Sequence, residues 1–531
     1  MPEPPCLMAI DLGTGSCRAI IFDADGNQVA TGQREWSHAS VPGFPGSQVF
    51  DTARNWTLIC ECIREAISRS GRPASAVAAV SSTSMREGMV LYDAAGREIW
   101  ACPNVDSRAS AEADELVSSG AARRIFEKGG DWVSITSPAR FAWIRRHEPD
   151  TFAAIAHMGM LSDWVLTRLT GVYVTDPSAG SSSNLFDLRT RSWAPESLDL
   201  IGVPLAAMPH VLEPGSVAGA VTDRAADETG LAPGTPVVVG GADTQLGLVG
   251  IGVVRPNRVT LVGGSFWQQT IVTDTPLIDP RARVRTLCHA IPGQWMTEGI
   301  GFYCGIAMRW YRDAFCELES RAAAERGVDA YAVMEEAASR IPPGSNGVLA
   351  VFSNVMDARR WVQASPSFLQ FDVDAPAGSN RVACIRALEE QAAYGAKAHL
   401  GILEELTGRR VDEVVFTGGA AKGTLWPRIV ADVLGVPVRI PVIKESTALG
   451  AALCAGVGAG LFEDLGDVTA SIVRFERTVE PDPAAAASYA EHYERWRAVY
   501  PRILQLSEER LLRPMWWPAG ASSKEPVPGL S

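Results

Sequence analysis

One aspartate at the end of an apolar strand pattern is the residue best placed for proton-transfer chemistry. Val237–Val239 are three β-branched residues that predict a short buried strand, and Gly240 and Gly241 predict a tight turn after it. Asp243 then stands at the carboxyl edge of the expected sheet, where open α/β sheets bind ligands. Its carboxylate could accept a proton from a substrate hydroxyl there. The alternative is that Asp243 only caps the helix that follows.

Two glycine-containing hairpin patterns could surround phosphate groups. Residues 7–23 read as two apolar strands joined by a Gly-Thr-Gly-Ser turn. The hydroxyls of Thr14 and Ser16 and the turn amides could hold phosphate, with the carboxylate of Asp11 pointing to the same place. Residues 257–273 repeat the pattern, which indicates two related halves. No Walker-type loop occurs and residues 13–18 do not complete a dinucleotide fingerprint, so a purely structural role for the first hairpin also fits its residues.

Two further stretches carry residue types suited to ligand binding. Arg86 and Glu87 stand between two apolar strand patterns, so both charges are expected at an end of a sheet, as a substrate clamp or as a structural ion pair. Residues 414–434 predict a strand, a glycine loop and a helix. Gly418 and Gly419 permit a close ligand approach, and the amino end of the helix favours an anion or a nucleotide.

The remaining patterns predict the elements that position these residues. Apolar residues at helical spacing, with capping residues and terminal glycines, predict helices over 51–70, most of 109–169, 381–406, 445–456 and 489–511. The serine-rich stretch 179–184 predicts a small polar loop, and the tail from Pro514 predicts a flexible end.

Composition limits the function classes. A chain of 531 residues is too long for one core and predicts at least two large domains. A net charge of −13 disfavours nucleic acid and anionic membranes as partners. No apolar run reaches membrane-spanning length, and the first residues lack the pattern of a signal peptide. Ten scattered cysteines are typical of a reduced, cytoplasmic protein without a zinc site.

Four features stand in one order: the Asp11 hairpin, Gly-Gly-Ala-Asp243, the Gly-Gly-Ser265 hairpin and Thr-Gly-Gly-Ala-Ala-Lys422. That order resembles the FGGY carbohydrate kinases over about residues 7–483. The resemblance implies an α/β fold of two actin-like (ribonuclease-H-like) domains with nucleotide in the cleft between them. Within the family the chain is most similar to the autoinducer-2 kinases, in segments 84–92, 99–108, 263–269, 308–316 and 474–483.

The resemblance also implies a division of the chain and a set of site residues. The expected units are an N-terminal kinase domain at 1–253, a C-terminal nucleotide-binding domain at 254–475, and a helix with a flexible tail at 476–531. Asp243 would be the catalytic base and, with Asp11, would hold Mg²⁺. The substrate candidates are Arg86, Glu87, Thr244 and Phe266. The ATP candidates are Thr14, Gly15, Ser16, Arg18, Gly263, Gly264, Ser265, Gly305, Arg309, Gly418, Gly419 and Lys422.

The activity that the resemblance implies is phosphorylation of a primary hydroxyl by ATP with Mg²⁺. For an autoinducer-2 kinase the substrate would be 4,5-dihydroxy-2,3-pentanedione, phosphorylated at the 5-hydroxyl in quorum-sensing signal processing. A pentulose or polyol kinase of the same family is the first alternative. A non-catalytic actin-like ATP-binding sensor is the second, but a sensor needs no base such as Asp243. A homodimer and a sugar-phosphotransferase regulator are further partner expectations, and no motif in the sequence shows either.

Overall fold

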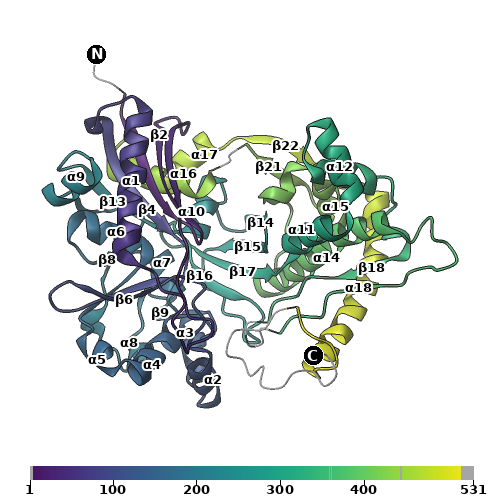
Figure 1. Ribbon diagram of the computed structural model, residues 1–531, viewed down its shortest axis with the longest axis horizontal. Helices are drawn as coiled ribbons and strands as arrows, with labels where there is room; N and C mark the ends of the chain where they lie inside the picture. The colour runs from purple at the N-terminus through teal and green to yellow at the C-terminus, as the bar shows by residue number, and fades with distance from the viewer. Residues whose placement is uncertain (1–3, 358, 360–361, 443–444, 516–531) are drawn as a thin grey trace.

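The computed structural model describes residues 4–357, 359, 362–442 and 445–515 (Figure 1). Two large β-sheets lie side by side, each with helices packed on it, and the first half of the chain forms most of the left side of the view. Within the described residues no helix is both long enough and apolar enough to cross a membrane.

The two large sheets have the same core topology. The first runs β12-β13-β4-β1-β2-β3 and the second β16-β17-β15-β14-β20-β21-β22. In each, three antiparallel strands are followed by two parallel ones: β3-β2-β1 then β4 and β13, and β17-β15-β14 then β20 and β21. This repeat confirms the predicted pair of related α/β halves of ribonuclease-H type.

The first sheet comprises β1 (Cys6–Leu12), β2 (Ser16–Asp23), β3 (Gln28–Glu35), β4 (Val77–Ser84), β12 (Val217–Ala220) and β13 (Pro236–Ala242). The second comprises β14 (Val259–Gly263), β15 (Trp267–Thr273), β16 (Arg285–Cys288), β17 (Trp295–Gly301), β20 (Val414–Thr417), β21 (Val438–Pro441) and β22 (Phe475–Val479). The small sheets contain β5 (Met89–Tyr92), β6 (Glu98–Cys102) and β7 (His157–Met160); β8 (Val174–Thr175) and β11 (His210–Val211); β9 (Phe186–Asp187) and β10 (Ser192–Trp193); and β18 (Leu349–Val351) and β19 (Ser367–Leu369).

The helices of the first half are α1 (Thr52–Ser70), α2 (Ser110–Ser118), α3 (Ala121–Gly129), α4 (Ser137–His147), α5 (Pro149–Ala154), α6 (Leu161–Thr170), α7 (Pro177–Ser182), α8 (Pro195–Ile201), α9 (Asp223–Thr229) and α10 (Asp243–Gly250). Those of the second half are α11 (Cys304–Phe315), α12 (Glu317–Arg326), α13 (Ala330–Ala338), α14 (Arg381–Thr407), α15 (Leu425–Leu434), α16 (Ser446–Gly458), α17 (Leu465–Ile472) and α18 (Pro483–Glu508).

Alternate residues of β1 face two different helical layers, as a strand requires. Met8 and Ile10 belong to the apolar core that contains the buried faces of α1 and α6, whereas Leu7 and Ala9 pack with α16. Helix α16 comes late in the chain, yet it covers the first sheet (Figure 1). The first sheet is therefore completed by a segment that follows the second one.

Helix α10 lies between the two sheets. Leu246 and Val249 pack into the core shared by the first sheet and α16, while Leu248 and Ile251, the residue after the helix, pack against apolar residues of the second sheet. Because both sides of α10 are buried, the position of Asp243 at its first turn depends on both halves of the protein.

Small residues allow α10 and α16 to approach closely. A methyl group at Gly450 of α16 would collide with the backbone carbonyl of Leu246, and one at Gly250 of α10 would collide with the carbonyl of Ser446. The predicted role of α16, a small-residue helix suited to close packing, is confirmed by this contact.

Two local predictions were wrong. Gly240 and Gly241 are the last part of strand β13 rather than a turn, and a side chain at Gly240 would strike the carbonyl of Ser82 on β4, so the glycine serves strand packing. Residues 179–184 lie mostly in helix α7 rather than in a loop. Asp176 caps that helix by accepting hydrogen bonds from two backbone amides. The hydroxyls of Ser181, Ser182 and Ser183 each donate to the carbonyl three residues earlier.

Most other element predictions are confirmed. Asp51 caps α1, Gly408 ends α14, and both glycine hairpins form. The last helix begins earlier than predicted, because Asp482 caps it and Pro483 occupies its first position. Most of the tail from Pro514 lies outside the described residues.

The contact between α10 and α16 makes a testable prediction for stability. Gly450→Ala should lower the free energy of unfolding by about 1–3 kcal/mol, because the added methyl meets rigid backbone in a packed interface. Gly401→Ala is the matched control: Gly401 is exposed in α14 with open space around it, so alanine there should be neutral or stabilising by up to about 1 kcal/mol. Urea unfolding measures both variants, and equal stability of the two would contradict the close helix contact.

Candidate active site

The carboxyl ends of three parallel strands meet at one edge of the first sheet. Asp11 of β1 lies level with Thr83 of β4, and Ala242 of β13 lies level with Ser84. The residues at or just beyond these strand ends therefore emerge together, among them Arg86 and Asp243. The predicted placement of these charges at one end of a sheet is confirmed.

Asp243 is half-buried at the first residue of α10. Its Oδ1 accepts hydrogen bonds from the backbone amide of Thr244 at 2.6 Å and from the Thr244 hydroxyl at 3.2 Å. The capping position belongs to Ala242, and no side chain caps the helix, so the capping alternative for Asp243 is not supported. The Thr447 hydroxyl of α16 donates to the Asp243 carbonyl at 3.3 Å and helps fix the turn.

The surroundings of Asp243 tune its proton affinity toward neutral pH. Burial raises the pKa of the carboxyl to about 6, because the charged form loses contact with water. The positive charge of Arg86 opposes this rise, and the negative charge of Asp11 adds to it. A carboxylate with this pKa is mainly ionised at neutral pH and holds a proton more strongly than an ordinary aspartate, which suits a general base.

Arg86 and Glu87 are buried, so they are not a surface ion pair. Arg86 Nη1 donates to Glu298 Oε1 at 2.8 Å, whereas Arg86 Nε lies 3.9 Å from Glu87 Oε1. The stronger partner of Arg86 is therefore a residue of β17, in the second sheet. Glu87 has a left-handed backbone with φ of 60°, a conformation that is costly for a side chain and is concentrated at functional sites.

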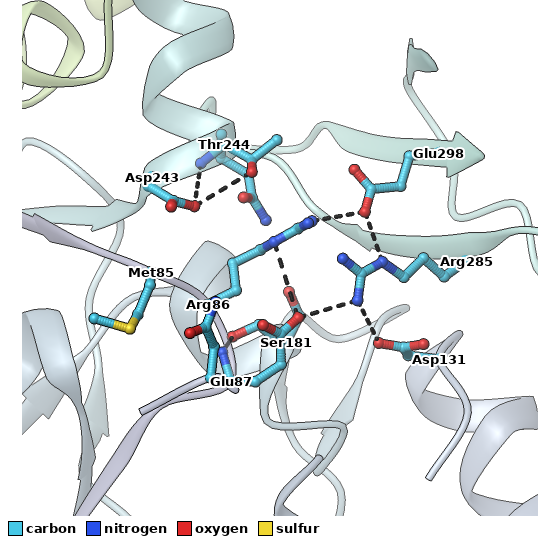
Figure 2. A network of polar contacts seen from close by, with 12 residues as sticks. Met85, Arg86, Glu87, Asp131, Ser181, Asp243, Thr244, Arg285 and Glu298 are labelled. Carbon is cyan, nitrogen blue, oxygen red and sulfur yellow. Dashed lines mark hydrogen bonds and ion pairs between the residues drawn. The ribbon is translucent and has the colours of Figure 1, made fainter. Parts of the chain in front are cut away.

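Arg285 connects these charges into one network (Figure 2). Its Nε donates to Glu298 Oε1 at 2.6 Å, and its Nη1 donates to Glu87 Oε1 at 3.0 Å and to Asp131 Oδ2 at 3.2 Å. Figure 2 shows the Arg86 side chain running between Asp243 and Glu298. The sequence prediction missed Arg285, Glu298 and Asp131.

Signals for the missed residues were present in the sequence. Arg285 begins β16 and Glu298 lies within β17, both beside apolar residues, and they stand directly opposite each other. Asp131 directly follows two glycines, and Asp243 follows two glycines and an alanine. The sequence alone does not give the register of β16 on β17, however, so it did not show that Arg285 and Glu298 are paired.

The charges within the network shift each other's proton affinities. Burial raises the pKa of Asp131, because the nearby positive charge of Arg285 compensates only in part. Burial also acts to raise the pKa of Glu298, but Arg86 and Arg285 outweigh it and hold that pKa below its usual range. Glu298 Oε2 is buried with no hydrogen-bond partner. The network is therefore ionised at Glu298, with one acceptor atom left unused.

The first glycine hairpin presents a second ionic cluster. Arg18 donates hydrogen bonds to both Asp11 and Glu445, which precedes α16. Burial raises the pKa of Asp11, and Arg18 opposes the rise. Thr14 and Gly15 are exposed at the turn, and Ser16 is half-buried. The turn is therefore accessible to a ligand, whereas Asp11 itself is buried against Arg18.

The other predicted nucleotide residues come from three segments that meet. Ser265 of the second hairpin accepts a hydrogen bond from Arg309 at 3.3 Å through its hydroxyl, and one from the Gly305 amide at 3.2 Å through its carbonyl. Gly418 has φ of 91° and packs against Gly263, where a Cβ would lie 2.6 Å from the Gly263 carbonyl. Lys422 ends the short 3₁₀ turn Gly419–Lys422 and is exposed.

The residues at these loops fit a nucleotide and its metal ion. Gly264 and Gly419 have no protein backbone within 3.4 Å of a would-be Cβ and no unusual φ, so neither packing nor conformation requires glycine there. Open glycines beside amide-rich turns suit close approach by phosphate. Asp11 and Asp243 repel each other, which a cation between them would relieve. Mg²⁺ commonly uses one or two carboxylates together with substrate phosphates.

Phe266 packs against two aromatic side chains of the second half. Its ring is 44% exposed and packs edge-on against Phe302, with 5.4 Å between ring centroids, and against Tyr303. Thr244, in contrast, lies beside Asp243 through its hydrogen bonds. Of the four predicted substrate residues, the structure brings Arg86, Glu87 and Thr244 into the neighbourhood of Asp243.

Comparison with known proteins places this site in a family. The model of the N-terminal domain of the FGGY family of carbohydrate kinases matches residues 6–250, and the model of the C-terminal domain matches residues 267–459. The chain belongs to the FGGY carbohydrate kinases. As a member of this family it is an ATP-dependent kinase.

Relatives and solved structures in the FGGY family are similar over almost the whole chain. The chain is 44% identical to an autoinducer-2 kinase of Yersinia enterocolitica over 96% of this chain and 97% of the relative, and 43% identical to one of Salmonella typhimurium with the same coverage. The structure is similar to a xylulose kinase from Rhodospirillum rubrum, with a TM-score of 0.84 and 27% identity over 95% of this chain and all of that one.

Proposed function

We propose that this FGGY kinase transfers the γ-phosphoryl group of ATP to the 5-hydroxyl of 4,5-dihydroxy-2,3-pentanedione, the autoinducer-2 precursor. The identity of 43–44% to autoinducer-2 kinases over nearly the full length supports this substrate. The observation that carries the reaction is Asp243, a half-buried carboxylate with a pKa of about 6 at the edge of the first sheet, between the charges of Arg86 and Asp11.

In this proposal each cluster of the site has one task. Asp243 accepts the proton of the substrate hydroxyl as it attacks phosphorus. The amides and hydroxyls of the two hairpins, with Arg309 and Lys422, would bind the nucleotide. Asp11 and Asp243 would hold Mg²⁺, which would supply charge neutralisation at the phosphates. Phosphoryl transfer requires mainly positioning and electrostatic stabilisation from the protein, so no covalent intermediate is needed.

The charge network suits a small polar substrate. Dihydroxypentanedione has little apolar surface, so its recognition must come from hydrogen bonds to its hydroxyl and carbonyl or hydrated oxygens. Arg86 offers donors and Glu87 offers acceptors, and both are buried, where such bonds discriminate strongly. The predicted division at 1–253, 254–475 and 476–531 remains part of the proposal, with α16 and α17 packing back on the first half.

Replacing Asp243 tests the proposed base. Asp243→Asn keeps the size of the side chain and an oxygen that accepts from Thr244, but it cannot take a proton. We expect the variant to fold and to bind ATP, and to transfer phosphate at least about a hundredfold more slowly, since loss of a general base typically costs about 10²–10⁴ in rate.

The measurement is single-turnover phosphoryl transfer, with nucleotide binding followed by calorimetry. Asp25→Asn is the matched control, because Asp25 is an exposed aspartate in the turn between β2 and β3. It should match wild type in both assays. Activity of Asp243→Asn within a few fold of wild type would show that the base lies elsewhere.

A substrate screen tests the acceptor. With ATP and Mg²⁺ held constant, dihydroxypentanedione should give a higher kcat/KM than xylulose, ribulose, glycerol or erythritol, and the product should carry phosphate on carbon five by ³¹P–¹³C coupling in NMR. Equal or faster turnover of xylulose would favour the pentulose kinase alternative, which the similarity to a xylulose kinase structure makes the first competitor. ATP binding with no acceptor turned over at all would favour a sensor.

A further inference from the structure

The strands that supply Arg285 and Glu298 dock directly on the first half of the protein. The Thr286 amide of β16 donates to the Gly130 carbonyl at 3.0 Å, and the Cys288 amide donates to the Ser181 hydroxyl of α7 at 3.0 Å. Ser182 of the same helix accepts from the Glu87 amide at 3.2 Å. Helix α7 thus links the backbone of β16 to the backbone of the Arg86–Glu87 turn.

The network contains three carboxylates. Among the described residues, Arg285 is the only one that contacts all three. It bonds Glu298, Glu87 and Asp131, and each of these four side chains is less than one-tenth exposed. Glu298 in turn holds Arg86 at 2.8 Å. The direct contact between the Arg86 and Glu87 side chains is long, so their shorter ionic contacts are with Glu298 and Arg285, respectively.

Because these charges are buried, the positions of the Arg86 and Glu87 side chains depend strongly on Arg285. The network contains two guanidinium groups and three carboxylates. Removing Arg285 would leave Glu87, Asp131 and Glu298 with one cation among them, in a place where unpaired charge is costly. Glu298 would then attract Arg86 without competition, and Glu87 would lose its 3.0 Å partner, so both proposed substrate contacts would move.

We propose that Arg285 is a positioning residue for the acceptor substrate, acting from the second half of the protein to set the geometry of Arg86 and Glu87. The inference rests on the proposed role of Arg86 and Glu87 as the acceptor site, but not on which acceptor binds. Arg285 itself takes no part in ATP binding, because its contacts within the network are to Glu87, Asp131 and Glu298 rather than to the glycine hairpins.

Steady-state kinetics of Arg285→Ala and Arg285→Lys test this role. In Arg285→Ala the KM of the acceptor should rise at least about tenfold, as expected when buried partner groups lose a hydrogen-bonding charge. The KM of ATP should stay within about twofold of wild type. Lysine keeps the charge but offers one nitrogen for three directed contacts, so Arg285→Lys should show a smaller rise, at least about threefold.

The control is Arg283→Ala. Arg283 lies two residues earlier and pairs with Asp279 and Glu405 outside the network, so its loss should leave both KM values at wild type. A merely structural role of Arg285 would reduce the fraction of active enzyme and hence kcat, with both KM values unchanged. Unchanged acceptor KM in folded Arg285→Ala would overturn the proposal, as would equal rises in both KM values.

A variant that fails to fold and a wrong assignment of the substrate can be distinguished from a failure of the proposed role of Arg285. If Arg285→Ala does not fold, as judged by circular dichroism and gel filtration, Arg285→Lys decides alone: a wild-type acceptor KM in that variant overturns the proposal. If wild type does not phosphorylate dihydroxypentanedione, the proposed substrate fails, and the same variants are measured with the acceptor that wild type does phosphorylate. The two failures therefore give different results.

Discussion

The burial of paired charges at the junction of the two sheets is the constraint on which the site depends. A charged group removed from water is costly unless partners compensate it, and here Arg86 and Arg285 share Glu298 while Arg285 also holds Glu87. These side chains come from both halves of the protein. The geometry of the proposed acceptor site and the docking of the two halves therefore depend on the same contacts.

The packing between the two halves also accounts for the raised pKa of Asp243, the proposed base. Helix α10 is packed between the first sheet with α16 on one side and the second sheet on the other, which limits the contact of its first turn with water. Burial then raises the pKa of Asp243, and Asp11 raises it further, while Arg86 limits the rise. Packing of apolar residues far from the reacting atoms thus sets the proton affinity of one carboxylate.

Much of the fold and part of the site followed from local sequence patterns. The hairpins, the strand before Asp243 and the helix caps are encoded by neighbouring residues, so they were predictable. Helix α7 (Pro177–Ser182) was not predictable in this way, because its stability comes from the Asp176 cap and from burial rather than from apolar spacing. Arg285 and Glu298 were missed for a similar reason: they lie about two hundred residues from Arg86, and only the docking of β16 brings them to it.

The central claim is that burial raises the proton affinity of Asp243, the proposed base, and the pKa of its carboxyl in the enzyme free of Mg²⁺ and nucleotide tests it most directly. Bound Mg²⁺ would lower that pKa, so the metal-free enzyme is the form to measure. Carbon-13 NMR of labelled aspartate carboxyls, with Asp243→Asn to identify the signal, should give a pKa of about 6 for Asp243. Titration of that signal at the ordinary value of an aspartate would contradict the account.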